Sequence, residues 1–189
     1  MLALVLAPRY AGCAVVDGFG LAPGSPESWD LRWYPDDAAR AVAVRDRVGR
    51  AVVLHKPTIA VLGVPSAAGS RCELLRRAAE DVLVAHRVVV AERHVTPARR
   101  LITGPWHGKR SPTLASAIIQ GFFPELARFR PGSIDRYRRH TWNAIALAIH
   151  ELVLCAPRSA FAMARTEAFD IPSFADAVTA SELRLHPEP

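Results

Sequence analysis

The first residues of the chain place the strongest constraint on its fold. Residues 2–7 form a continuous apolar run that Pro8 ends, long enough for one buried strand. A second apolar run at residues 12–17 follows a short turn, so the two predict a pair of neighbouring strands. A loop that follows such a strand often carries functional residues. The residue at this point is Ala7, whose methyl group has no acid, base, ligand or nucleophile chemistry.

The rest of the chain alternates between strand and helix patterns. Residues 29–34 alternate and predict a third strand, which closes a small antiparallel meander. Helical spacing over residues 38–56 and 71–86 separates apolar strands at 59–64 and 87–91. A short helix over 96–103, a further helix from residue 111 and a long helix over about 134–155 follow. This order predicts an α/β fold with a mixed five-stranded sheet, antiparallel first and parallel afterwards, flanked by helices. We assign residues 1–156 to this domain and residues 157–189 to a C-terminal appendage.

Composition excludes several classes of protein. Half of the 189 residues are hydrophobic and 22% are charged, which favours a folded globular chain over a disordered one. The longest apolar runs, at 144–149 and 152–156, are separated by charged or polar residues and are too short to span a membrane. No basic segment precedes the first apolar run, so we expect no signal peptide and a cytoplasmic protein. Three widely spaced cysteines fit neither a disulfide nor a metal pattern and predict free thiols in a reducing compartment: Cys13, Cys72 and Cys155.

Positive charge is concentrated in one block. Residues 87–139 contain eleven Lys and Arg against three acids, a net +8, whereas the remaining residues carry 13 against 15, a net −2. Such a block is a candidate phosphate-binding face. The alternative is an ordinary solvated surface rich in arginine.

Three segments resemble one protein family. Residues 4–8 (Leu-Val-Leu-Ala-Pro) and 12–16 (Gly-Cys-Ala-Val-Val) resemble the opening of the RuvC family of Holliday-junction resolvases, within the RNase H-like superfamily, where Asp-Pro-Gly follows the first strand. The Thr96-Pro97 helix start and the Gly108-Lys109-Arg110 loop resemble a second stretch of that family. Residues 140–150 resemble its C-terminal acidic helix, which reads Asp-x-x-Asp-Ala-Leu-Ala. The segments cover about residues 1–155 and imply an RNase H-like fold.

The same resemblance implies that the catalytic site is degenerate. Enzymes of this family arrange about four side chains around two Mg²⁺ ions, which require hard, anionic oxygen ligands. Ala7 stands where the family has its first-strand Asp, and Gly63 stands at about the position of the next acid. In the last helix His140 occupies a position that carries Asp or His in the family, and Asn143 replaces the second acid. Three of the four positions have therefore lost a negative charge, which predicts a pseudonuclease without metal or cofactor.

Other acids could in principle rebuild a metal site. Asp17, Glu73 and His140 are the candidates for a relocated site in an active endonuclease, although each acid also has an ordinary surface or capping role. His140 and Asn143 lie three residues apart on one helix face. We favour a hydrogen-bonded polar cluster for this pair over a metal-binding role.

Two hypotheses for function remain. In the first, the chain binds structured or branched nucleic acid, DNA being favoured over RNA. Four basic residues are expected to contact phosphates: Arg99, Arg100, Lys109 and Arg110. Trp106 or His107 is expected to stack on a base. An ordinary exposed loop position is the alternative for His107. In the second hypothesis, the fold serves protein contacts, as a homodimer or as a subunit of a larger complex. The helix at residues 71–86 resembles the pairing element, and residues 157–189 form a docking segment.

Overall fold

The computed structural model describes residues 1–17, 20–64, 69–103, 119, 123, 126 and 136–155. Within that part, six strands form one mixed sheet in the order β3-β2-β1-β5-β6, with β4 also paired to β2. The strands are β1 (Leu2–Leu6), β2 (Tyr10–Asp17), β3 (Gly20–Leu21), β4 (Glu27–Asp30), β5 (Ile59–Val64) and β6 (Val89–His94). β2 pairs antiparallel with β1, β3 and β4, whereas β1, β5 and β6 run parallel. β1 is central and buried along its whole length, in agreement with its continuous apolar sequence.

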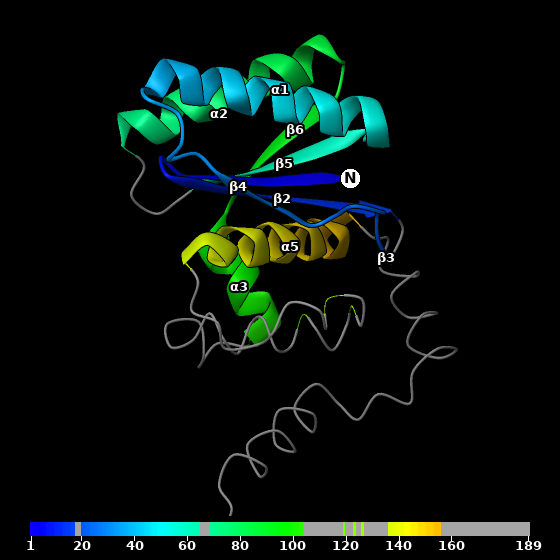
Figure 1. Cartoon of the computed structure of the whole chain (residues 1–189). Helices are drawn as coiled ribbons and strands as arrows, with labels where there is room; N and C mark the ends of the chain where they lie inside the picture. The colour runs from blue at the N-terminus through cyan, green and yellow to red at the C-terminus, as the bar shows by residue number, and fades with distance from the viewer. Residues whose placement is uncertain are drawn as a thin grey trace, which may run out of the picture. The chain divides into compact units, whose positions relative to one another are not determined.

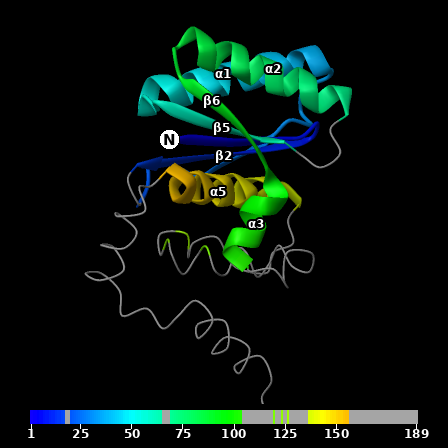
Figure 2. The same ribbon diagram turned by 180° about the vertical axis from the view of Figure 1, so that it is seen from behind.

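Helices cover both faces of this sheet (Figure 1). α1 (Asp37–His55) and α2 (Ser70–Ala85) lie together on one face, whereas α5 (Arg136–Cys155) lies on the other, with α3 (Val95–Thr103) beside it. The view from behind gives the same three layers (Figure 2). α1 begins after Asp36, whose carboxylate accepts a hydrogen bond of 2.7 Å from the Ala39 N–H, as expected of an N-cap. It ends at Lys56, which adopts a left-handed conformation with φ 46°.

The alternation of β1 divides the core into two clusters. Leu2, Leu4 and Leu6 point toward α1 and α2, and they pack in one cluster with Leu62 of β5. Ala3 and Val5 point the other way and pack in a second cluster that includes buried residues of α5. The face covered by α5 is the face on which Ala7 continues the alternation after Val5.

The contacts of α5 follow one row of the sheet. Five residues form this row, each from a different strand. In order across the sheet they are Ser28 of β4, Gly12 of β2, Val5 of β1, Gly63 of β5 and Arg93 of β6. Thr141 hydrogen-bonds the Ser28 hydroxyl and donates to the Glu27 carbonyl oxygen at 3.3 Å. Farther along the helix, Leu147 lies over Gly63 and the Glu151 carboxylate accepts two hydrogen bonds from Arg93, at 2.8 and 3.0 Å. These contacts carry α5 across the sheet from β4 to β6.

The expected α/β fold is confirmed, with local corrections. The third strand is not at residues 29–34: β4 ends at Asp30, because the Arg32 backbone N–H and guanidinium both donate to the Asp30 carboxylate and turn the chain there. The short strand β3 raises the strand number from five to six. β6 begins two residues later than expected and continues through Glu92 and Arg93, whose side chains pair with Arg76 and Glu151.

The chain divides into two compact units, Met1–Leu152 and Val153–Pro189. The expected boundary after residue 156 stays a prediction, because residues 156–189 lie outside the described part of the chain. In the described residues, no helix is both long enough and apolar enough to cross a membrane.

Candidate functional site

Ala7 and Gly63 lie at the same end of the sheet, on the face that α5 covers. β1 and β5 are parallel, so their carboxyl ends meet at one edge, where Val5 is paired with Gly63. The Ala7 N–H donates to the Tyr10 carbonyl oxygen at 3.0 Å and closes the turn into β2. Neither residue offers a polar side chain at the point where the resemblance places two carboxylates.

The space beyond Gly63 is filled by other side chains. A Cβ atom built on Gly63 would lie 2.7 Å from Cδ1 of Leu147 and 2.9 Å from Cγ2 of Val5. It would also lie 3.2 Å from the Leu4 carbonyl oxygen. A side chain at this position would therefore overlap Leu147 and Val5 unless they shift. The donor set at this edge does not fit a pair of Mg²⁺ ions.

His140 and Asn143 lie on α5 at the predicted site. The backbone of His140 and Thr141 packs directly on Gly12, where an added Cβ would lie 2.2 Å from the His140 carbonyl carbon. Asn143 is 8% exposed and Thr141 is 5% exposed. The buried Nδ1 of His140 has no hydrogen-bond partner among the residues that the structure describes. The polar cluster expected for His140 and Asn143 stays a prediction.

Burial makes His140 a weak base. Desolvation, followed by repulsion from the Arg139 guanidinium, lowers the pKa of His140 from 6.5 to about 4. The imidazole is therefore neutral at pH 7.

This lowered pKa predicts that acid destabilises the fold. Between about pH 6.5 and 4 the unfolded chain binds a proton at His140 that the folded chain does not, so the free energy of unfolding falls as pH drops, by at most about 3 kcal/mol. We expect His140→Gln to remove this contribution, measured as the change in urea midpoint between about pH 7.5 and pH 5. His150, whose pKa burial also lowers, retains its own smaller contribution. His86→Gln, at an exposed position, is the control. An unchanged pH dependence in His140→Gln contradicts the burial of a neutral imidazole.

Positive charge gathers at the beginning of α5. Arg139 is exposed and lies close enough to repel both Arg99 and His140. Arg99, on α3, is half-buried, and desolvation and then the Arg139 charge lower its pKa. Arg100 is exposed on the same helix. The structure thus brings Arg99 of the predicted basic set near Arg139, which adjoins His140 and which the sequence did not single out.

A cation–aromatic pair lies beside Ala7. The Arg32 guanidinium lies 4.9 Å from the ring centroid of Tyr10. Tyr10 shares the sheet face of Gly12 by alternation, and its carbonyl oxygen accepts the Ala7 N–H. The sequence pattern gave neither residue a functional role, because it placed Arg32 inside a strand.

The candidates for a relocated metal site do not meet. Asp17 ends β2 beside the Met1 amino group, at the opposite end of β1 from Ala7. Glu73 lies on α2, which covers the sheet face opposite to α5 and His140. In the described part of the chain, no group of three or more His, Cys, Asp or Glu residues is placed to hold a metal ion. The proposed set of Asp17, Glu73 and His140 is thus separated by the fold.

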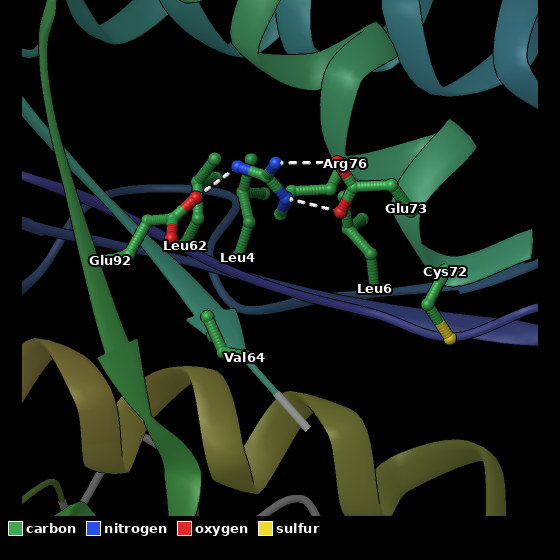
Figure 3. A pocket seen from close by; sticks show the side chains of 9 residues that line it. Leu4, Leu6, Leu62, Val64, Cys72, Glu73, Arg76 and Glu92 are labelled. Carbon is green, nitrogen blue, oxygen red and sulfur yellow. Dashed lines mark hydrogen bonds and ion pairs between the residues drawn. The ribbon is translucent and has the colours of Figure 1, made fainter. Parts of the chain in front are cut away.

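Glu73 instead belongs to an ion-pair network (Figure 3). It lines a hollow of about 140 Å³ at the carboxyl ends of β1 and β5, together with Cys72, Arg76 and Glu92. Arg76 donates to Glu73 at 2.7 Å, to Glu80 at 3.2 Å and to Glu92. Hydrogen bonds from Arg76 and Arg77 lower the pKa of Glu73 to about 2. The carboxylate is therefore ionised but already paired with two guanidinium groups.

The remaining predicted contacts fall outside the described residues. Trp106, His107, Lys109 and Arg110 belong to residues 104–118. Their proposed contacts with phosphates and bases stay predictions.

Known proteins match this chain in structure but not in sequence. No protein-family model matches, and no relative is found among curated sequences. A structure of Thermus thermophilus RuvC matches with a TM-score of 0.61 and 14% identity, over 78% of this chain and 89% of that chain. T. thermophilus RuvC in complex with a Holliday junction substrate matches equally, with a TM-score of 0.61 and 13% identity. The expected RuvC-like fold is confirmed.

Proposed function

We propose that this chain uses a RuvC fold to bind branched DNA without cleaving it. The observation that carries the proposal is the positive charge beside His140, together with the lack of carboxylates at Ala7 and Gly63. Arg139 stands close to His140, and Arg99 stands close to Arg139. Such a site repels Mg²⁺ and attracts phosphate. The T. thermophilus relative in complex with a Holliday junction substrate supports branched DNA as the ligand.

The geometry at Gly63 supports the loss of catalysis. Leu147 and Val5 occupy the space that a metal-binding side chain would need. A nuclease of the two-metal class requires anionic oxygens on both sides of the ion pair. The acids that line the hollow at the carboxyl ends of β1 and β5, Glu73 and Glu92, both pair with Arg76.

Salt-dependent binding tests the proposal. We expect the full chain to bind a four-way DNA junction at about 50 mM salt, with log affinity falling linearly with log salt. The double variant Arg99→Ala/Arg139→Ala is expected to reduce the slope by about 2, because each lost phosphate contact removes about one unit. The junction is expected to stay intact with added Mg²⁺ or Mn²⁺.

A matched control keeps this test specific. Arg50 is an exposed arginine on α1, on the other side of the sheet, and Arg50→Ala is expected to leave the slope unchanged. Undetectable junction binding by the wild-type chain would refute the proposed function. Cleavage that depends on the added metal would instead assign an active endonuclease.

A protein-binding role is the second candidate function. α2 carries exposed Leu74 and Val84 on either side of Arg77 and Asp81. Two such helices related by a two-fold axis would set Leu74 against Val84 and Arg77 against Asp81. This pattern supports a homodimer, in addition to DNA binding or in place of it. Junction binding separates the two cases.

A further inference from the structure

Trp33 is an exposed aromatic side chain on a rigid turn. It is 82% exposed, between β4 and α1. Its neighbours are anchored: Leu31 is fully buried and Tyr34 packs against the core. The turn therefore has little freedom to withdraw the indole from solvent.

Hydrogen bonds fix the backbone of this turn. Arg40 of α1 donates to the Leu31 carbonyl oxygen at 3.1 Å and to the Tyr34 carbonyl oxygen at 3.3 Å. The Leu31 N–H donates to the Arg9 carbonyl oxygen at 2.9 Å, which joins the turn to the β1–β2 connection. The backbone of this turn is therefore ordered before any ligand binds, so binding loses little conformational entropy there.

The Asp30 carboxylate orients the side chains. It accepts hydrogen bonds from the Arg32 guanidinium at 2.7 and 3.0 Å. The Trp33 side chain lies close enough to Asp30 to contribute, after Arg32, to the lowered pKa of that carboxyl. The indole follows this ion pair directly in the chain, and most of its surface stays open to solvent.

The turn lies at the sheet edge of the degenerate site. β4 and β1 both end there, since Tyr10 is paired with Asp30 and its carbonyl accepts the Ala7 N–H. Arg32 stacks on Tyr10 at this edge, and Arg9 is exposed in the adjoining turn. An open aromatic ring next to arginines matches a nucleotide, which presents a π face and a phosphate together.

We infer that Trp33 is a stacking platform for an unpaired base, with Arg32 and Arg9 facing the phosphates on either side of it. The inference rests on the proposed DNA-binding function and extends it to a preference for DNA with unstacked bases. Base-paired DNA offers few open base faces, so Trp33 contributes little to the binding of intact duplex.

Two DNA probes test this platform. One is a duplex with a single-stranded gap of about six nucleotides, and the other is the same duplex fully paired, both at about 50 mM salt. Trp33→Ala is expected to weaken gapped DNA about five- to hundredfold and to change binding to paired DNA less than about twofold. Trp33→Phe is expected to retain most of the gapped-DNA affinity, because phenyl rings also stack on bases. Urea unfolding checks that each variant is folded.

Leu54→Ala provides the matched control. Leu54 is 72% exposed, as an apolar side chain, but lies on the last turn of α1. This variant is expected to bind both DNAs as the wild type does. Equal loss on both DNAs, or no loss on gapped DNA, overturns the stacking platform and leaves the proposed function standing. A wild-type chain that binds the four-way junction but neither probe also overturns the stacking platform alone, whereas one that binds none of the three DNAs contradicts the proposed function itself.

Discussion

Gly12→Ala is expected to abolish or severely weaken folding. The added methyl carbon would lie 2.2 Å from the His140 carbonyl carbon and 2.3 Å from the Thr141 nitrogen, both backbone atoms. No rotamer change relieves an overlap with backbone, so α5 must move off the sheet. We expect a loss of more than about 3 kcal/mol, a large share of the total stability of an ordinary domain. Urea unfolding measures this loss as a lowered midpoint or a missing cooperative transition.

Gly49→Ala is the matched control. Gly49 lies inside α1, and a Cβ there meets only Cγ1 of Val82 at 3.9 Å, an ordinary contact. The substitution is expected to stabilise the protein by about 0.5–1 kcal/mol, because alanine favours a helix interior more than glycine does. Wild-type stability in Gly12→Ala would show that α5 does not rest on β2 at this point.

Gly63→Asp is expected to destabilise the fold without creating a metal site. The new side chain would meet Leu147 and Val5 and would bring a charge into their apolar cluster. We expect a cost of about 4 kcal/mol or more, measured by urea unfolding, because the new side chain overlaps its neighbours at a buried position and its neighbour in register, Arg93, is already bonded to Glu151. Added Mg²⁺ is expected to recover none of this loss. Recovery with Mg²⁺, together with junction cleavage, would contradict the non-catalytic proposal.

A second substitution separates the two causes. Gly63→Ala introduces the overlap without the charge and is expected to cost about 1–3 kcal/mol. Leu147→Ala in the same chain removes the closest atom, so the two substitutions together are expected to cost less than the sum of their separate effects. The aspartate variant is expected to gain less from Leu147→Ala, since its charge stays buried.

Much of the fold could be predicted because its elements have local causes. α1 follows an Asp36 cap, and β5 is an apolar run bounded by Pro57, so both were located within one residue. β4 and β6 were misplaced because their boundaries depend on partners. Asp30 ends β4 through its bonds with Arg32, and β6 continues through Glu92 and Arg93 toward Arg76 and Glu151. A window of sequence does not contain those partners.

The residues at the ends of β1 and β5 could be named from the sequence, whereas the side chains that surround them could not. Ala7 and Gly63 follow from the comparison of motifs along the chain. The placement of Leu147 over Gly63, and of Arg139 beside Arg99, depends on where α5 crosses the sheet. α5 can approach the sheet closely there because Gly12 has no side chain. In the sequence, Gly12 indicates only the start of a strand.

The position of α5 also affects how the chain matures during synthesis. Thr141 joins Ser28 across 113 residues of sequence, and α5 is made after every strand that it covers. At ordinary translation rates of about 5–20 residues per second, this interval lasts about 6–20 s. From the synthesis of β6 until that of α5, the later part of this interval, the sheet face with Ala3, Val5 and Val61 lacks the helix that covers it. We therefore expect the nascent chain to depend on holding chaperones and to aggregate when synthesis stops before residue 136.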